Sequence, residues 1–518
     1  MRTLGLLLAV ACQAQTFRVA GTILNSESAA PVGKARISLI ATGRTRTVVT
    51  APDGRFSFDV PAGKYSLVAD VREMRQGYGL RTPNAGFGIA IIAGPDQKTD
   101  DLVFRWFPPA VLTGRILDSF GEPVERAQIS MTRIAVLNGE RHVYFYGNRY
   151  TDDRGEYRFA PILPGSYYVR VSATPWYASN TLPRGMHSAA EDRAAYATVF
   201  YPGTRTARAA TPIAIKPGQE GRADFTLDET HGVAIHVHCD CGKDSKSLTL
   251  IEEGVNGFQD QQRTATIVRG EAEFTSVAPG RYAIRITGQE DGQEVIAWQV
   301  VEAGASDVDV RMAPKPAPSI SGKVEFQNPA SRPQRSIRMQ MMYDVTGFVF
   351  AKTVAADGSF EFPGLQPARY QPIGIAGQFA SDIFTEDGAL HEGYFDLSDG
   401  RPVKIRVVAS DATSRVKGYV KLGDRAIPGV TVLLAAQKDS ANHSRYRAFQ
   451  TDSDGSFDIQ NVRPGDYYLF AVDQPELEYA SPAALRPYFE TARPIRIEPT
   501  KTYDEIVPLS TQVRQAIP

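Results

Sequence analysis

The residues best suited to metal or redox chemistry gather in one short segment. Between positions 231 and 241 the chain contains His231, His236, His238, Cys239, Asp240 and Cys241. Side chains two residues apart on a strand share a face, so His236, His238 and Asp240 would lie on one face and the two cysteines on the other. A metal ion could use the histidines or the thiols, but hardly both sets. The alternative is an exposed histidine strand whose thiols stay free or form a Cys239–Cys241 disulfide in an oxidising compartment.

The sequence lacks the common catalytic motifs. A zinc peptidase needs a pattern such as His-Glu-x-x-His, but only His391 is followed by glutamate, and no second histidine follows at the required distance. Neither a Gly-x-Ser-x-Gly elbow nor a Walker-type phosphate loop occurs. An enzyme would have to use carboxylates of the acidic segment 382–399, and their spacing does not demand this. We therefore expect no enzymatic activity and no cofactor.

The aspartates Asp452 and Asp454 before Gly455 invite a calcium interpretation. Calcium usually takes six or more oxygen ligands, whereas this turn offers two carboxylates and no matching distal glutamate. Asp-Gly is also a common sequence for a tight hairpin turn, because glycine readily adopts a positive φ. We therefore interpret these residues as turn residues.

Aromatic residues in four insertions are the candidates for ligand binding. The insertions follow the same predicted strand and cover residues 72–88, 174–210, 376–400 and 475–492. Loops at one end of a rigid β-sandwich often carry recognition, and aromatic rings beside polar groups suit sugars or peptides. The predicted ligand-binding residues are Trp176, Tyr177, Tyr196, Tyr201, Tyr394 and Tyr488. The alternative is a structural cover over the end of each sandwich, which the paired aromatics at 200–201, 394–395 and 488–489 favour.

These candidates belong to a pattern that the chain repeats five times. A glycine turn precedes alternating apolar residues, and a Pro-Gly-x-Tyr element follows. The turn glycines are Gly54, Gly155, Gly270, Gly358 and Gly455, and the tyrosines are Tyr65, Tyr167, Tyr282, Tyr370 and Tyr467. Glycine and tyrosine are 11 residues apart in the first copy and 12 in the others, and successive glycines are 88 to 115 residues apart. This period matches a small sandwich domain rather than a solenoid repeat.

The alternation within each copy predicts strands with one buried face. Phe56 and Phe58 would face a core, and we expect the repeated tyrosine to pack there or to bond its hydroxyl to the backbone. A glycine also interrupts the first strand of each copy, at Gly21, Gly114, Gly322 and Gly418, with Gly232 as a weaker match. Each copy would have about seven strands, the usual number in an immunoglobulin-like sandwich. Helical periodicity is nearly absent.

This order of elements resembles that of the carboxypeptidase regulatory-like modules. The likeness extends over nearly all of residues 16–510 and is weakest in the third copy, which lacks the Asp-Gly turn. The resemblance implies a prealbumin-like sandwich, grouped with collagen-adhesin B-type repeats and classed with carbohydrate-binding-like domains. It also implies a secreted or outer-membrane bacterial setting. It transfers no catalytic residue, because the peptidase chemistry of that family lies in a separate domain.

Composition fits a folded chain of several domains. The 518 residues are 42% apolar and carry a net charge of −1, which gives no reason to expect nucleic acid or an anionic membrane as partner. The N-terminus predicts an export signal over residues 1–14, and Cys12 is compatible with a lipid anchor. No other stretch is long and apolar enough to span a membrane. The predicted all-β modules cover 16–107, 108–230 with the long insertion, 231–313, 318–411 and 414–512.

These observations favour an exported binding or adhesion protein of the cell envelope. It would recognise carbohydrate or an envelope protein through the aromatic loops, in the periplasm, at the outer membrane surface or outside the cell. The alternative is a non-catalytic spacer or accessory of an outer-membrane transport or secretion assembly.

Overall fold

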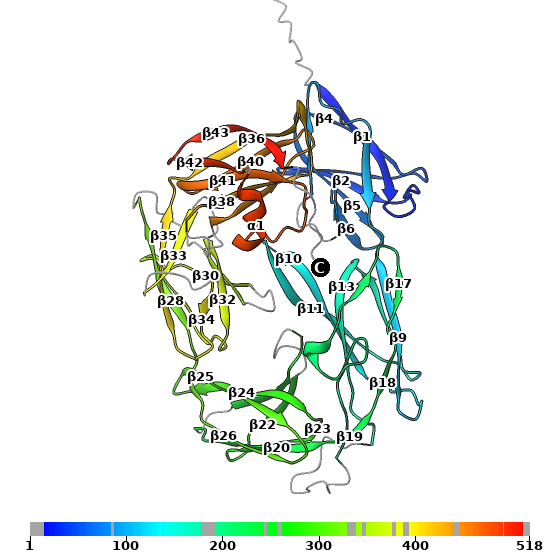
Figure 1. Ribbon diagram of the computed structural model, residues 1–518, viewed down its shortest axis with the longest axis vertical. Coiled ribbons are helices and arrows are strands. Elements are labelled where there is room, and N and C mark those ends of the chain that lie inside the picture. Colours follow the sequence, from blue (N-terminus) through cyan, green and yellow to red (C-terminus); the bar gives the residue numbers. More distant parts are fainter. Residues whose placement is uncertain are drawn as a thin grey trace, which may run out of the picture.

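The computed structural model describes residues 15–83, 88–137, 139–177, 193–242, 246–255, 262–328, 338–343, 349–375, 380–386, 393–438, 445–490 and 492–510. Five separate clusters of buried apolar side chains follow one another along the chain, each within one predicted module (Figure 1). The predicted fold class is therefore confirmed: the protein is a tandem array of β-sandwich modules. We number the modules 1 to 5 in chain order.

Module 1 shows the arrangement in its simplest form. Its strands are β1 (Thr16–Asn25), β2 (Arg36–Ala41), β3 (Arg44–Val49), β4 (Arg55–Pro61), β5 (Gly63–Val71), β6 (Met74–Gly77), β7 (Ala90–Ala93) and β8 (Leu102–Trp106). Strand β1 lies between β4, which is antiparallel to it, and β8, which is parallel to it. The second sheet has β2 between β3 and β5, with β6 and β7 beyond β5. The side chains between the two sheets form the core.

The other modules repeat this arrangement. The strands of module 2 are β9 (Ala110–Asp118), β10 (Gln128–Leu137), β11 (Glu140–Tyr150), β12 (Glu156–Ile162), β13 (Gly165–Ser172), β14 (Ala194–Tyr196), β15 (Val199–Phe200), β16 (Ile213–Ile215), β17 (Glu220–Arg222), β18 (Phe225–Leu227) and β19 (Glu229–His231), with a 3-10 turn at Ala207–Ala209. Those of module 3 are β20 (Val233–Cys239), β21 (Lys246–Glu252), β22 (Gln262–Thr266), β23 (Glu271–Val277), β24 (Gly280–Glu290), β25 (Gln293–Ala303), β26 (Val308–Met312) and β27 (Lys315–Pro316).

Modules 4 and 5 complete the chain. Module 4 contains β28 (Ile320–Phe326), β29 (Arg338–Tyr343), β30 (Val349–Thr353), β31 (Ser359–Phe362), β32 (Arg369–Ile375), β33 (Ala380–Thr385), β34 (Phe395–Asp396) and β35 (Val403–Ser410). Module 5 contains β36 (Ser414–Leu422), β37 (Arg425–Ala426), β38 (Thr431–Ala436), β39 (Arg447–Gln450), β40 (Ser456–Val462), β41 (Gly465–Val472), helix α1 (Pro482–Phe489), β42 (Arg493–Ile497) and β43 (Thr502–Ser510). In every module the first strand has an antiparallel partner from the glycine-turn hairpin on one side and a parallel partner from the end of the module on the other.

The repeated motif forms the local structure that its residues predict. All five turn glycines have a positive φ, between 72° and 91°. The apolar residues after the turn point into the core, as Phe56 and Phe58 do in module 1. In four modules the repeated tyrosine donates its hydroxyl hydrogen bond to the carbonyl four residues earlier: Tyr65 to Pro61, Tyr167 to Leu163, Tyr282 to Ala278 and Tyr370 to Gln366. The predicted hydroxyl-to-backbone bond is confirmed there.

A buried threonine forms a second set of hydrogen bonds that is repeated between modules and that the sequence pattern did not predict. Thr50, Thr151 and Thr451 each stand four residues before the turn glycine. Each hydroxyl donates to a carbonyl, of Val32, Val124 and Ile427 respectively, and accepts from a backbone N–H a few residues further on, of Ala35, Ala127 and Val430. The constant spacing to the turn glycine was the available signal. Its effect is to pin the loop before the second strand to the hairpin of the motif.

The first-strand glycine allows an unusually close approach of two backbones. A Cβ atom on Gly21, Gly114, Gly322 or Gly418 would lie 1.8 to 2.1 Å from a carbonyl oxygen of the parallel strand. In the other modules this glycine pairs with the first apolar residue after the turn, as Gly21 does with Phe56. In module 3 the equivalent position is Val237, which pairs with the small Ala272. The weak match at Gly232 was therefore wrong: Gly232 lies outside the strand, and its backbone N–H donates to the carbonyl of Arg193.

Replacing the wedged glycine tests this constraint. We expect Gly114→Ala to lower the free energy of unfolding of module 2 by about 2–4 kcal/mol, because the new methyl group would overlap the carbonyl of Ala223. Gly147→Ala in the same module is the matched control, since its Cβ would meet no atom within 4 Å. Thermal unfolding followed by circular dichroism measures both. Equal stability of the two variants would contradict the argument.

The insertions add structure that periodicity alone did not predict. The insertion of module 5 contains α1, an α-helix of eight residues. Ser481 is its N-cap residue, and the Ser481 side chain accepts a hydrogen bond from the backbone N–H of Ala484. Aromatic residues of the helix pack on the sheet: the rings of Phe470 and Tyr488 stack at 5.9 Å, and those of Tyr468 and Phe489 at 4.8 Å. The sequence predicts a loop here, because two turns of helix show little periodicity. Such a short helix is not stable alone, and packing on the sheet of module 5 stabilises it.

The five modules close into a ring, with module 5 beside module 1 (Figure 1). Lys64 Nζ lies 2.6 Å from Asp452 Oδ2, and Ser453 exchanges hydrogen bonds with Ala90 and Ile92 on the edge strand β7. The 6% exposed Asp452 carboxylate is therefore neutralised by a side chain almost four hundred residues away. Because these are bonds between the first and last modules, the chain cannot be an extended rod in this structure.

The β10–β11 hairpin of module 2 joins the two sides of the ring. It points towards α1 in Figure 1. At its tip, Glu140 accepts hydrogen bonds from Gln371 at 2.9 Å and Tyr394 at 3.1 Å, both in module 4. The next residue, Arg141, forms an ion pair of 2.7 Å with Glu478 of module 5. One hairpin therefore contacts two modules that lie far from it in the sequence.

The Lys64–Asp452 pair gives ring closure a pH dependence. Burial is the main cause that raises the pKa of Asp452, and Lys64 opposes it. Lys64→Met would raise this pKa further, so we expect a loss of about 1–3 kcal/mol near neutral pH. The loss should shrink as the pH falls towards about 4, because a protonated Asp452 has no charge to neutralise. Thermal unfolding of the variant at both pH values measures this, with exposed Lys98→Met as control. A loss that is independent of pH would contradict it.

Candidate functional site

A cleft between modules 2 and 3 is the best-formed candidate site. Its volume is about 360 Å³. One wall comes from the insertion of module 2, which contributes Thr174, Ala195, Tyr196 and Thr198. The facing wall comes from module 3 and contains Leu250, Glu252, Arg263, Ser276, Ala278 and Tyr282. Tyr150, at the end of β11, stands at the opening with 60% of its surface exposed. The insertion that the sequence marked for recognition thus forms a cleft by meeting another module.

Glu252, which lines the cleft, belongs to a charge network between modules 2 and 3. Glu252 accepts hydrogen bonds from Arg170 and from Thr198, the latter at 2.8 Å. Arg170 also stacks over Phe200, with its guanidinium carbon 5.8 Å from the ring centre. Burial lowers the pKa of Arg263, whose guanidinium lies over Phe274 and donates to the carbonyl of Thr275. Burial likewise raises the pKa of Tyr282, whose hydroxyl donates to Ala278. These bonds hold the side chains of Glu252, Arg263 and Tyr282 in the wall of the cleft.

The same elements hold modules 2 and 3 together. Arg193, within the insertion, forms an ion pair of 2.5 Å with Asp307 of module 3. Asp307 also accepts the backbone N–H of Ala234, and these two bonds lower its pKa. Because module 2 is anchored at this point, the walls of the cleft are held at a fixed separation.

Two of the predicted aromatic residues form an exposed pair near the cleft. Trp176 is 91% exposed, and its ring meets that of Tyr177 edge to face at 5.4 Å. Tyr177 donates its hydroxyl to Glu229, and this bond raises its pKa to about 12. Glu229 pairs with Tyr196 in the β14–β19 ladder, which connects this pair to the cleft wall.

The other predicted aromatic residues are held by their own or neighbouring modules. Tyr196 is 8% exposed and, like the partly buried Tyr201, packs on the core of module 2. The Tyr394 hydroxyl donates to Glu140 across the ring. Tyr488 belongs to α1, stacks on Phe470 of β41 and donates to Gln474 at 2.7 Å. The structural role that the paired aromatics suggested is thus visible for these side chains, and Tyr196 combines it with a place in the cleft wall.

The His236 and His238 side chains lie on the outer face of β20 among carboxylates. Glu273 and Asp307 lie 3.9 Å from His236, and Glu271 and Asp309 lie 3.8 and 3.9 Å from His238. Asp240 follows the strand, where its backbone N–H donates to Met312. Within the part of the chain that the structure describes, no three of these residue types are grouped closely enough to hold a metal ion.

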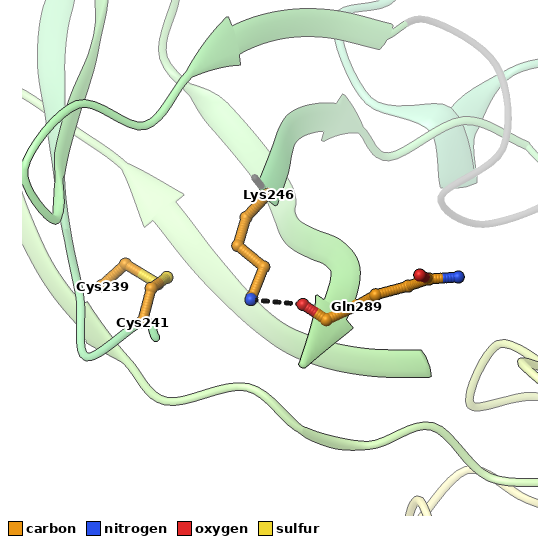
Figure 2. The surroundings of a disulfide bond; sticks show 4 residues. All are labelled: Cys239, Cys241, Lys246 and Gln289. Atoms are coloured by element: carbon orange, nitrogen blue, oxygen red, sulfur yellow. Dashed lines mark hydrogen bonds between the residues drawn. A yellow bond between two sulfur atoms is a disulfide. The ribbon is translucent and has the colours of Figure 1, made fainter. Parts of the chain in front are cut away.

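Cys239 and Cys241 form a disulfide bond, with their Cα atoms 5.1 Å apart (Figure 2). Cys239 points into the core of module 3 and Cys241 packs against the same core. The cysteines therefore lie on the opposite side of β20 from the histidines, as strand alternation predicts. Nearby in Figure 2, Lys246 donates to the carbonyl of Gln289.

The remaining acidic candidates are engaged in bonds between modules or within turns. Asp382 is buried between Arg463 at 2.5 Å and Arg445 at 3.4 Å, both in module 5. Asp454 accepts the backbone N–H of Ser456, while Asp452 pairs with Lys64. Residue His391 lies outside the described residues.

The sheets define the class of protein: a chain of tandem β-sandwich modules. Residues 18–85 match the family model of the carboxypeptidase regulatory-like domain. This confirms, for module 1, the family that the motif order resembles. No curated protein matches the chain. No helix in the described ranges is long and apolar enough to cross a membrane.

Solved structures with related architecture are distant. The TIE protein of Bacillus anthracis is 14% identical, with 77% of this chain and 69% of that protein covered and a TM-score of 0.17. A streptococcal ancillary pilin is 12% identical, covering 54% and 97%, with a TM-score of 0.18. Two B repeats of the collagen-binding protein of Staphylococcus aureus are 9% identical, covering 76% and 99%, with a TM-score of 0.14. At these scores the likeness says nothing about function, and the fold assignment rests on the sheets themselves.

The disulfide gives a direct chemical prediction. After air oxidation and denaturation, maleimide labelling should leave Cys239 and Cys241 unmodified until a reductant is added, and mass spectrometry of the peptide that contains both would show this. Reduction should cost at most about 1.5 kcal/mol, because the bond closes a very short loop. Labelling of both thiols without a reductant would contradict the assignment.

Proposed function

We propose that this protein is an exported, non-catalytic binding protein of the bacterial cell envelope that holds a carbohydrate in the cleft between modules 2 and 3. The single observation that carries the proposal is the cleft itself. It combines an exposed aromatic ring, Tyr150, with a wall of fixed polar groups. Sugars present apolar faces to aromatic rings and hydroxyl groups to such polar groups.

The proposal extends to Trp176 and Tyr177 at the rim. Trp176 is the most exposed of the large side chains described, and burying it against a ligand would remove its apolar ring from water. The ring is held by Tyr177, whose hydroxyl is fixed on Glu229. A bound saccharide longer than the cleft could extend onto this pair. Export through residues 1–14, with or without a lipid on Cys12, would bring the site to the envelope.

Aromatic replacement tests the proposal. We expect Tyr150→Ala to weaken binding on a glycan array of neutral oligosaccharides by about tenfold, because a stacking surface is lost, and Trp176→Ala to weaken long ligands more than short ones. Phe145→Ala is the matched control, because Phe145 is an exposed aromatic residue on the same strand β11 but does not line the cleft. Unchanged binding by Tyr150→Ala, or binding only to an envelope protein, would overturn the carbohydrate assignment.

A structural role in a larger assembly is the second candidate, and one observation favours it. Ion pairs and hydrogen bonds join modules that are distant in sequence, such as Lys64 with Asp452 and Arg141 with Glu478. A closed ring is a stiff building block. Small-angle scattering that shows a compact particle, together with no glycan binding, would favour this role over the first.

A further inference from the structure

The outer face of module 2 carries a second hollow, lined by arginines. Its volume is about 580 Å³, and residues of β9, β12 and β17 line it. Strands β9 and β17 lie at the outer edge of the ring (Figure 1). Four arginines surround it: Arg115, Arg149, Arg158 and Arg222. Two carboxylates, of Asp152 and Glu156, also border it. The local charge is therefore positive, although the whole chain is nearly neutral.

Strand register explains the shape of the hollow. Arg158 on β12 and Arg222 on β17 both pair with Thr113 on β9, so the three side chains form one row across the sheet. Arg115 follows two residues after Thr113 and points the same way. Thr113 has a short side chain between the long side chains of Arg158 and Arg222, so Thr113 forms the floor of the hollow. The two flanking arginines are two strand spacings apart, about 10 Å.

The arginines differ in how far they are already neutralised. Arg158 pairs with Glu220 at 3.3 Å, and Arg222 pairs with Asp224 at 2.7 Å. Arg115 donates to the carbonyl of Arg154, and Arg149 donates to the carbonyl of Asn148 while its guanidinium lies 5.3 Å above Phe159. Within the described residues neither Arg115 nor Arg149 has an ion-pair partner. Two guanidinium groups thus remain available to an anion.

The carboxylates at the edge are occupied as well. Asp152 accepts the backbone N–H groups of Arg154 and Glu156, and these bonds lower its pKa. Glu156 forms an ion pair with Arg154 at 2.9 Å. Among the described residues neither carboxylate forms an ion pair with Arg115 or Arg149, although Glu156 stands opposite Arg115 in the strand register. With Arg154, Glu220 and Asp224 included, five arginines meet four carboxylates, so a small excess of positive charge remains at the hollow.

The corresponding sheets of modules 3 and 5 lack this feature. In module 5, Arg415 binds Asp458 through two hydrogen bonds of 2.6 Å, and Lys417 pairs with Asp504. In module 3, the same face presents two histidines among four carboxylates. The arginine hollow of module 2 is thus not shared by modules 3 and 5.

We propose that this hollow binds the carboxylate or sulfate groups of an acidic polysaccharide. Arginine presents paired donors that match such oxyanions. Tyr150 borders both this hollow and the cleft, so one extended chain could occupy the two in sequence. A nucleic-acid strand carries one charge per about 3.4 Å, so its closely spaced phosphates would also meet the carboxylates of Asp152 and Glu156 at this hollow. The acidic class of the ligand rests on these arginines and deepens the proposed carbohydrate function.

The test uses the full chain and immobilised polymers in low salt: heparin as the sulfated probe, polygalacturonate as the carboxylated probe, dextran as the neutral one and single-stranded DNA. We expect binding to at least one acidic polysaccharide, which identifies the anionic group. The Arg115→Gln/Arg149→Gln double variant should bind it about tenfold more weakly, because two charged hydrogen-bond donors are lost. Arg105→Gln/Arg208→Gln, an equal change of charge at exposed sites elsewhere, should bind normally.

Three outcomes would overturn the proposal: binding to no acidic polysaccharide, equal binding by both double variants, or DNA binding as tight as polysaccharide binding. Circular dichroism of the variants confirms that each is folded. Failure of this proposal is separable from failure of the cleft. If Tyr150→Ala abolishes binding of neutral glycans, the proposal for the cleft stands. If binding of the acidic polysaccharide survives Tyr150→Ala but is lost in the Arg115→Gln/Arg149→Gln variant, only the proposal for the hollow stands.

Discussion

Four of the five modules depend on one close approach of backbones. In four modules the first strand passes so near its parallel partner that only glycine fits, because a methyl group would overlap a carbonyl oxygen. This contact joins the beginning of a module to its end. The hairpin of the repeated motif then holds the other edge of the same strand. Each module is therefore closed by its first strand, and its two termini emerge in defined places.

Because the two ends of each module have fixed positions, the chain of five modules can close into a ring. The polypeptide between modules 3 and 4 is itself held, since β27 pairs with β25 and the N–H of Ala317 donates to Glu294. Between modules 1 and 2, Gln76 exchanges two hydrogen bonds with the backbone of Phe107. With such short, bonded connections, the direction of each module follows from the one before it. Charged pairs between modules then fix the closure.

Function follows from these junctions more than from the modules themselves. The cleft exists because the insertion of module 2 meets module 3, and the arginine hollow exists because three strands place their outer residues in one row. Aromatic residues of the insertions divide into two groups. Some, such as Tyr488 and Phe489, stabilise their module, whereas Trp176 and Tyr177 stay at the surface. The repeated fold is thus a support on which individual modules carry different surfaces.

The sequence by itself determined the strands, the hairpin turns, the five cores and the hydroxyl bond of the repeated tyrosine. These features depend on short-range rules: alternation with period two, the positive φ of glycine and the reach of one side chain over four residues. The sequence also indicated the insertions, but it did not indicate that one of them would contain α1. Helix α1 needed the surface of module 5 to complete its packing.

Only the tertiary structure decided ring closure, the cleft and the row of arginines. Alternation shows that Arg115 and Arg158 face outwards, but it does not show that their strands are neighbours or that a third, distant strand adds Arg222. In the same way, nothing near Asp452 in the sequence announces Lys64 as its partner. Long-range pairing depends on the angles between modules, and these arise from the sum of many contacts rather than from any local pattern.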